Sequence, residues 1–282
     1  MKIVLGQNAY GKNAVNLSKI TRFPDHHEFR QISVNVVLEG DFESAHTAGD
    51  NTALLPTDTQ KNTVYALAKD HFSASIEEFG MYLADHFFNN NPHVSRSKIQ
   101  ITEHLYIRAS FDGNLHPHAF IANNAEKHTA EIIHDQAVIG VTAGISGLLV
   151  LKTTGSGFEN YIKDQYTTLK ETNDRILATE CEAEWDYQLN DLDFSAKHGD
   201  IRLSLINTFS HHQSLSLQQT MFAMGENVLK ENEEVREIRF KMPNKHHILF
   251  NLEQFGMDNN NEIFIATDEP YGYITGTVTR EE

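Results

Sequence analysis

The feature that most constrains the fold is an order of predicted elements that occurs twice. Residues 1–136 and 137–282 each carry patterns for strand–strand–helix–helix–strand–strand, although the two halves share little sequence identity. Antiparallel sheets with helices on one face make an α+β architecture, so we predict two tandem ββααββ repeats with these boundaries. Sheet edges left open by such repeats need protection, which pairing across subunits commonly provides.

In the first half, residues 32–38 alternate with a period of two and have one mostly apolar face, as a strand does. The first long helix begins at Thr57, and Ser75 with Glu78 forms a capping box in front of the second. Glu103 interrupts an otherwise apolar strand face. The strands are expected at residues 14–20, 32–38, 99–107 and 118–134.

In the second half, the Gly-spaced apolar run from residue 137 to 152 predicts a bent central strand. Residues 177–187 alternate most regularly and have one acidic side, which we expect to face solvent. Two helices follow, with core residues at helical spacing: Ile201, Leu205, Phe209, Leu217, Met221, Met224 and Val228. The last strands are expected at residues 236–240, 247–252 and 262–266.

Composition limits the classes of partner. With 40% hydrophobic and 22% charged residues, the chain reads as a soluble globular protein. No apolar run is long enough to span a membrane, so no membrane span is expected. The net charge of −16 repels nucleic acid and anionic membranes, and we expect neither as a partner. Any anion site must therefore rely on backbone N–H groups and a few placed cations.

The cysteine count and the terminal residues lead us to expect a particular compartment. Cys181 is the single cysteine and cannot form an intrachain disulfide, which fits a reducing compartment. The amino-terminal residues are too polar for a signal peptide, and the final residues differ from the Ser-Lys-Leu peroxisomal address. We expect a cytoplasmic protein.

Common cofactor signatures are missing from the sequence, including G-x-G-x-x-G after a strand, the P-loop lysine, C-x-x-C and H-E-x-x-H. His116 and His118 offer two imidazoles in a segment that reads as a turn, but no third metal ligand accompanies them. We predict no metal site and no cofactor.

A loop rich in threonine and charge, residues 158–175, offers an aromatic ring at one end and a guanidinium at the other. A planar anion could stack on Phe158 and receive a fork of N–H donors from Arg175. A core phenylalanine and a solvated arginine would give the same pattern, so this segment does not decide by itself.

Two segments of the first half allow both a structural and a catalytic interpretation. Tyr10, Gly11 and Lys12 lie between extended stretches, where they suit either a hairpin turn or a lysine that accepts a proton. Thr57 and Asp58 open a helix, which explains them as capping residues, but a helix start also favours an electron-rich ligand.

Two segments of the second half occupy comparable places. Leu217 and Gln218 stand near the start of the last helix, which matches the position of the Thr57 helix in the first repeat. Two such helix starts could face one another across a subunit boundary. Asn244 and His246 enter a strand and carry an amide and an imidazole.

Together these segments resemble the urate oxidase (uricase) family of cofactor-independent oxidases, which are built from two tunnelling-fold repeats. The resemblance runs from VLGQNAYGK near the start to PYGYITGTV near the end and includes TDTQKNT, SLQQT and PNKHH. It implies a homotetramer whose sheets close into a tunnel, with active sites at subunit interfaces. The implied substrates are urate and O2.

The resemblance also implies a role for each candidate residue. Phe158 would stack under the purine, with Arg175 and Gln218 gripping opposite edges, while Thr57 and the Asp58 main chain come from the neighbouring subunit. Leu217, where the family more often has valine, would offer a backbone group. The remaining assignments are Asn244, which would hold oxygen above the ring, and the proton relay of Lys12, Thr57 and His246.

Such a site makes urate a good electron donor by removing its protons, so that O2 can oxidise it to 5-hydroxyisourate with release of hydrogen peroxide. One alternative is a pterin enzyme of the same fold, but those rely on zinc, for which no ligand set is identified. The other is a non-catalytic purine-binding protein, against which the intact relay argues.

Overall fold

The computed structural model describes residues 1–136 and 138–281, which form two compact units. Unit 1 comprises Met1–Gly144 and Asp186–His198, and unit 2 comprises Ile145–Trp185 and Gly199–Glu282. In the described residues the strands are hydrogen-bonded in chain order, from β1 to β8. Ala137, where we expect the second repeat to begin, and Glu282, its last residue, lie outside the described residues.

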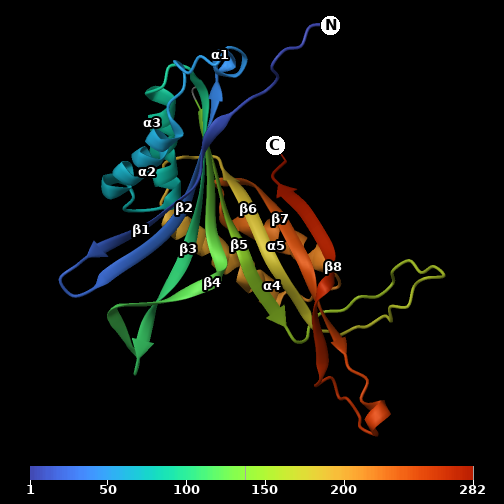
Figure 1. The fold of residues 1–282 in the computed structure, drawn as a ribbon. Helices are drawn as coiled ribbons and strands as arrows, with labels where there is room; N and C mark the ends of the chain where they lie inside the picture. The colour runs from blue at the N-terminus through green and yellow to red at the C-terminus, as the bar shows by residue number, and fades with distance from the viewer. Residues whose placement is uncertain (137, 282) are drawn as a thin grey trace. The chain divides into compact units, whose positions relative to one another are not determined.

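The α+β class and the antiparallel strand–strand–helix–helix–strand–strand order are confirmed in both halves (Figure 1), with the short elements α1 and η1 as additions that the sequence patterns did not predict. The described elements are β1 (Tyr10–Arg22), β2 (His27–Gly40), α1 (Glu43–Thr47), α2 (Thr57–His71), α3 (Ile76–Asn89), β3 (Val94–Phe111), β4 (Asn114–Asp135), β5 (Val138–Lys152), β6 (Leu177–Tyr187), α4 (Phe194–His211), α5 (Leu217–Glu231), β7 (Val235–Leu249), η1 (Glu253–Phe255) and β8 (Phe264–Thr279).

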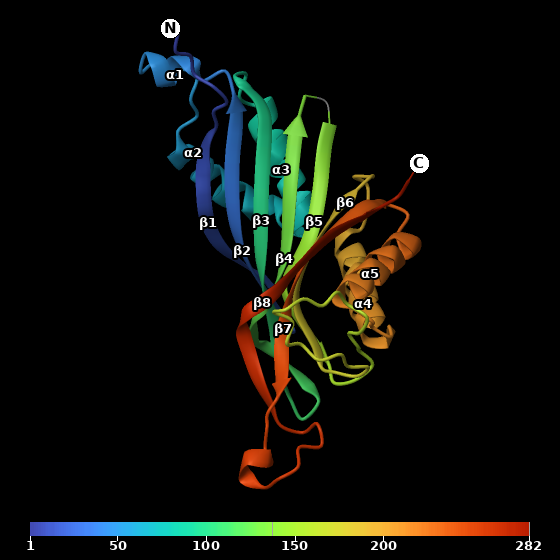
Figure 2. The same cartoon turned by 90° about the vertical axis from the view of Figure 1, so that its right-hand side faces the viewer.

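In unit 1, helices α2 and α3 cover one face of strands β1 to β4 (Figure 2). The covered face of β2 is the predicted one, because Ile32, Val34, Val36 and Leu38 are fully buried. Burying a side chain of this size stabilises the fold by about 1.5–3 kcal/mol. The capping box at the start of α3 is also confirmed, with the Ser75 hydroxyl accepting the N–H of Glu78.

In unit 2, helix α5 packs on β7 and β8. The helical core residues expected from their spacing are all buried. The alternation of β6 is confirmed too, since every second residue from Leu177 to Tyr187 is buried and the acidic side is the more exposed one. In the described part of the chain, no helix combines the length and apolar character needed to cross a bilayer.

Three local expectations were wrong. Residues 236–240 and 247–252 do not form two strands, because β7 continues through Pro243, whose place opposite Tyr273 of β8 is kept. Tyr10–Lys12 is part of β1 and not a turn, and His116 with His118 lies in β4. In each case pairing with a long neighbouring strand overrides the local preference for a turn.

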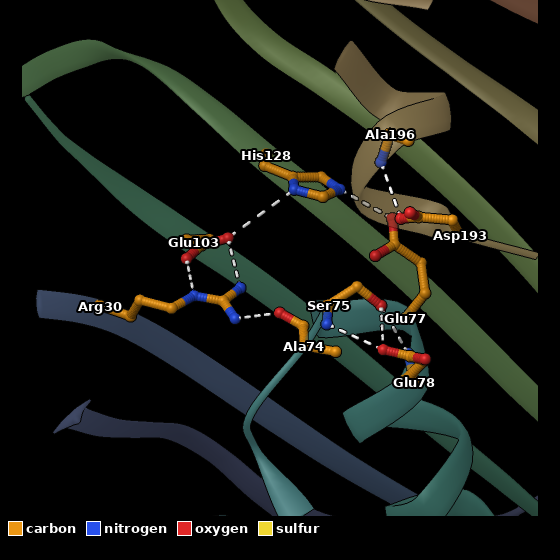
Figure 3. Close-up of polar contacts among 9 residues, drawn as sticks. All are labelled: Arg30, Ala74, Ser75, Glu77, Glu78, Glu103, His128, Asp193 and Ala196. Atoms are coloured by element: carbon orange, nitrogen blue, oxygen red, sulfur yellow. Dashed lines mark hydrogen bonds and ion pairs between the residues drawn. The ribbon is translucent and has the colours of Figure 1, made fainter. Parts of the chain in front are cut away.

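Glu103, the exception on its apolar strand face, is buried, and its charge is paired with that of Arg30 (Figure 3). Its carboxylate accepts Arg30 Nε at 2.6 Å and Nη2 at 3.0 Å, and Arg30 Nη1 also donates to the Ala74 carbonyl. His128 Nε2 lies 2.7 Å from Glu77 Oε1, a fully buried carboxylate. A cavity of 280 Å³ adjoins these groups in unit 1. Because Arg30 is paired with Glu103 and His128 with Glu77, we regard this network as structural.

Candidate active site

Hydrogen bonds fix how α2 lies along β1 in unit 1. The contacts, in chain order along β1, are Leu55 N–H to the Tyr10 hydroxyl (2.8 Å), the Tyr65 hydroxyl to the Asn16 carbonyl (3.1 Å) and Lys19 Nζ to the Ala68 carbonyl (3.0 Å). Helix and strand therefore run in the same direction. The first turn of α2 lies beside the end of β1 that carries Lys12.

A β-bulge follows Lys12. The pairing of β1 with β2 shifts directly after this residue, and Ala14 has a φ of 55° while its N–H donates to Asn35 Oδ1 at 2.8 Å. Bulges re-aim neighbouring side chains and are frequent next to active sites. Before the bulge, a Cβ on Gly11 would stand 1.8 Å from the Val36 carbonyl oxygen, so the close approach of β1 to β2 requires glycine.

The first turn of α2 leaves backbone donors open. Pro56 supplies no side-chain cap, and the first helical N–H with a carbonyl partner is that of Gln60, 3.0 Å from the Pro56 oxygen. Among the described residues, no hydrogen bond engages the N–H groups of Thr57 and Asp58. Free N–H groups at the positive end of a helix dipole form a site for an anionic or electron-rich ligand.

The Asp58 carboxylate is engaged within its own helix. It accepts Lys61 Nζ at 2.5 Å and Asn62 Nδ2 at 3.0 Å. The pKa of Asp58 is lowered, chiefly by its hydrogen bond and charge interaction with Lys61, and the charge of Lys12 adds to this effect. Lys12 is therefore near the first turn of α2, and the backbone of Asp58 is the part left for a ligand.

In unit 2, the β5–β6 loop is closed by backbone pairs that bring Phe158 and Arg175 together. Phe158 exchanges hydrogen bonds with Thr172 at 2.7 and 3.2 Å, and the Arg175 N–H donates to the Ser156 carbonyl at 2.7 Å. The Asp174 carboxylate holds the turn by accepting the Gly155 N–H at 2.9 Å. The guanidinium carbon of Arg175 consequently lies 5.3 Å from the centre of the Phe158 ring.

The Arg175 side chain is a half-buried cation without a counter-ion in the described part of the chain. Its Nε is buried and has no hydrogen-bond partner among those residues. Burial lowers the pKa of the guanidinium from its usual value, because the charged form has lost water. A buried guanidinium nitrogen without an acceptor is costly, and an anionic ligand could supply that acceptor.

The same loop is attached to the start of α5. The Gly157 N–H donates to the Ser214 carbonyl at 2.8 Å, and the Ser214 N–H donates to Gly155 at 3.0 Å. The Ser216 hydroxyl caps α5, with Leu217 buried and Gln218 exposed in the first turn. These backbone hydrogen bonds place the loop that contains Phe158 and Arg175 next to the segment that leads into α5.

Asn244 and His246 lie at the same end of unit 2. Residues two apart share a strand face, so Asn244 lies on the face of β7 that carries the buried Phe240 and Met242. His246 follows on the same strand, beyond the point where the pairing of β7 with β8 shifts register. Helix α5 covers the earlier part of this face, because a Cβ on Gly276, which pairs with Phe240, would meet Met221 at 2.3 Å. Further along the helix, a Cβ on Gly225 would stand 2.6 Å from Val278, which pairs with Ile238, so the start of α5 lies on the Asn244 side.

The structure thus gathers the expected site residues into two groups. Lys12, Thr57 and Asp58 form the first, around the start of α2 in unit 1. The second lies around the start of α5 in unit 2 and consists of Phe158, Arg175, Leu217, Gln218, Asn244 and His246. Of the described residues, no three histidine, cysteine, aspartate or glutamate side chains are grouped to hold a metal ion.

Two tyrosines contact these groups or the segment that leads into them, and the sequence patterns gave neither a role. Tyr161 stacks on Phe158 with ring centres 4.9 Å apart, and its hydroxyl donates to the Leu169 carbonyl at 2.7 Å. Tyr10 holds Leu55, two residues before Thr57. The sequence signals for them were their positions, since Tyr161 comes three residues after Phe158 and Tyr10 two residues before Lys12.

Comparisons with known proteins agree on one family. The sequence profile of the Uricase family matches residues 8–133 and 141–275. Uricase from Arthrobacter globiformis is 46% identical over 280 residues, which cover 99% of this chain and 91% of that protein. Uricase from Oryctolagus cuniculus is 35% identical, covering 98% of this chain and 94% of that protein. The crystal structure of the Arthrobacter globiformis uricase superposes with a TM-score of 0.94, covering 100% and 96% of the respective chains.

Proposed function

The chain belongs to the uricase family and is a urate oxidase of purine degradation, and from this premise we propose how its residues act. The reaction is the oxidation of urate by O2 and water to 5-hydroxyisourate and hydrogen peroxide. Urate gives up two electrons to O2, and water supplies the new hydroxyl. We propose that no metal or other cofactor takes part.

The second group of residues clamps the substrate. Urate is a flat anion, and it stacks on Phe158 while the Arg175 guanidinium donates to acceptors on one edge. Gln218 binds the opposite edge through its amide, and Leu217 adds a backbone N–H from the first turn of α5. This clamp satisfies the guanidinium that is otherwise left without a partner.

The first group completes the site from a neighbouring subunit. The open N–H of Asp58 and the Thr57 hydroxyl approach the substrate at the positive end of α2. Lys12, Thr57 and His246 form the relay that removes protons from urate, which raises its ability to donate electrons. Asn244 holds O2, and later water, over the ring.

The assembly that follows from this arrangement is a homotetramer with active sites at the interfaces between subunits. Each chain contributes two tunnelling-fold repeats, residues 1–136 and 137–282, whose sheets close into a tunnel on assembly. We place the enzyme in the cytoplasm, where its single thiol would stay reduced.

The observation that carries the proposal is the Arg175 guanidinium beside the Phe158 ring, with its buried Nε left without a partner among the described residues. The test is to mix urate with purified, exhaustively chelated protein in air and to follow urate absorbance and oxygen uptake together. We expect urate and dissolved oxygen to be consumed in equal molar amounts. A requirement for zinc would point to the pterin enzymes of this fold, and urate binding without consumption would point to a non-catalytic relative.

A further inference from the structure

The Tyr10 side chain connects the strand of Lys12 with the segment that leads into Thr57. Its hydroxyl accepts the Leu55 N–H at 2.8 Å, and its ring lies edge-on to the fully buried Phe42 with centres 4.8 Å apart. The hydroxyl is therefore held on a rigid support. It anchors the backbone two residues before the helix that carries Thr57.

A second polar side chain acts on the same segment. Gln60 is fully buried in the first turns of α2, and its Nε2 donates to the Leu55 carbonyl at 3.2 Å. Both backbone groups of Leu55 are thus held by side chains, one from β1 and one from α2. The open first turn of α2 has no side-chain cap of its own, and these two contacts hold the segment that leads into Thr57.

The position matters because the relay residues reach the site from different elements. Lys12 is two residues after Tyr10 and directly before the β-bulge, whereas Thr57 is the first residue of α2. Proton transfer requires donor and acceptor within hydrogen-bond reach, so a small displacement of either residue is costly.

We propose that Tyr10 is a positioning residue for the proton relay, whose hydroxyl fixes Thr57 and the open N–H groups of α2 relative to Lys12. This role rests on the proposed function. Burial raises the pKa of the Tyr10 phenol, so the group stays protonated and uncharged in its contact with Leu55.

The test compares two variants that each lose one tyrosine hydroxyl. In each case the hydrogen bond of that hydroxyl joins β1 to α2 or to the segment directly before α2. Tyr10→Phe removes the contact with Leu55. Tyr65→Phe is the matched control, because its hydroxyl joins the same helix to the Asn16 carbonyl at 3.1 Å but two turns away from Thr57. For each protein we would measure kcat, KM for urate, thermal midpoint and hydrogen exchange of the peptide covering residues 54–60.

We expect Tyr10→Phe to lower kcat by about tenfold or more while KM changes by less than about threefold, because misplacement by a fraction of an ångström impairs proton transfer. Exchange in residues 54–60 should become faster. Tyr65→Phe should leave kcat, KM and this exchange as in the wild type. Gln60→Met frees the Leu55 carbonyl and removes the contact of Gln60 with the Tyr10 phenol but keeps the phenol itself. It should reproduce the loss in kcat if Tyr10→Phe does not fold.

A wild-type kcat in Tyr10→Phe would overturn the inference. Equal losses of kcat in Tyr10→Phe and Tyr65→Phe would also overturn it, since they would reflect general stability. Unchanged exchange in residues 54–60 of Tyr10→Phe would also contradict it. Failure of the proposed function is a separate outcome, because the wild type and Tyr65→Phe would then not consume urate.

Discussion

The Arg175 guanidinium carbon lies 5.3 Å from the centre of the Phe158 ring, and the two residues are brought together by backbone pairs that close their loop. A flat anion has both surfaces it needs at this place, an aromatic face for stacking and a fork of N–H donors for its edge. The buried Nε of Arg175 has no protein partner among the described residues, which supports the proposed urate site.

Replacing Arg175 by alanine should chiefly weaken binding. Hydrogen bonds to a charged group contribute about 1.5–3 kcal/mol, so we expect KM for urate to rise by roughly 10- to 150-fold. Arg175→Lys should recover only part of this loss, because an ammonium lacks the planar fork. Steady-state kinetics and the affinity for a non-reacting purine would measure the effect, with the exposed Arg22→Ala as control. An unchanged purine affinity in Arg175→Ala would refute the clamp.

Lys12→Met and Thr57→Ala should impair turnover more than binding. General acid–base catalysis contributes about 10²- to 10⁴-fold, and we expect kcat to fall within this range in both variants. The affinity for a non-reacting purine should change far less, because the clamp in unit 2 is intact. Lys2→Met, at an exposed position near the amino terminus, serves as control. Full turnover in both relay variants would exclude them from proton transfer.

Gly11→Ala should destabilise the fold because its Cβ would stand 1.8 Å from the Val36 carbonyl oxygen. Forcing β1 away from β2 should cost about 1–3 kcal/mol and lower the unfolding midpoint. Gly6→Ala is the matched control, since a Cβ at Gly6 meets nothing within 4 Å. Denaturant unfolding of the two variants would measure the difference. Equal midpoints would mean that β1 has room at this position.

The Gly11 contact also explains one limit of the sequence analysis. A Tyr-Gly-Lys segment between extended stretches looks like a turn, and only the backbone of β2 beside it gives the glycine its purpose. The sequence patterns likewise divided β7 into residues 236–240 and 247–252, whereas Pro243 and Asn244 between them pair with β8. Local patterns record the preferences of a segment but not the strand that will lie next to it.

Elements whose burial pattern is periodic were predictable, as β2, β6 and the core face of α5 show. The buried Glu103 was visible only as an irregularity, since its partner Arg30 is 73 positions away in the sequence. The candidate site has the same character. Its residues were proposed through a family resemblance, whereas the contacts of Tyr10 with Leu55 and of Tyr161 with Phe158 required coordinates.

Cys181 should be unreactive in the folded protein. Burial raises the pKa of its thiol from 9.0 to about 12, and the nearby Glu182 adds to this effect. The thiolate is the reactive form, so a thiol-specific reagent at pH 8 should label Cys181 only after denaturation. Rapid labelling of the native protein would show that the thiol is accessible. Cys181→Ser, which has no thiol, provides the background for the assay.

The same thiol gives a pH dependence with a defined sign. Its folded pKa lies above the unfolded value, so its contribution to stability is complete below pH 9.0 and is lost as the pH rises toward about 12. Denaturant unfolding between pH 8 and 10.5 should therefore show a steeper loss of stability in the wild type than in Cys181→Ala. Parallel pH profiles of the two proteins would contradict this linkage.

The strongest test of a site shared between subunits mixes two impaired variants and assays them at a urate concentration near the wild-type KM, where both turn over slowly. Lys12→Met damages the group in unit 1, and Arg175→Ala damages the group in unit 2. If each site takes one group from each of two chains, a hybrid assembly contains some sites with both groups intact. Statistical mixing of equal amounts gives such sites a share of about one quarter, from ½ × ½, so activity should return toward about one quarter of the wild type.

The control is a mixture of Lys12→Met with Thr57→Ala, which damage the same group and cannot complement each other across an interface. Differently tagged chains would be unfolded and refolded together, and hybrids would be isolated through both tags before the assay. Complementation in the first mixture and none in the second is the expected pair of results. If verified hybrids of Lys12→Met and Arg175→Ala stay inactive, both groups must come from one chain, and a separated monomer would then be expected to oxidise urate.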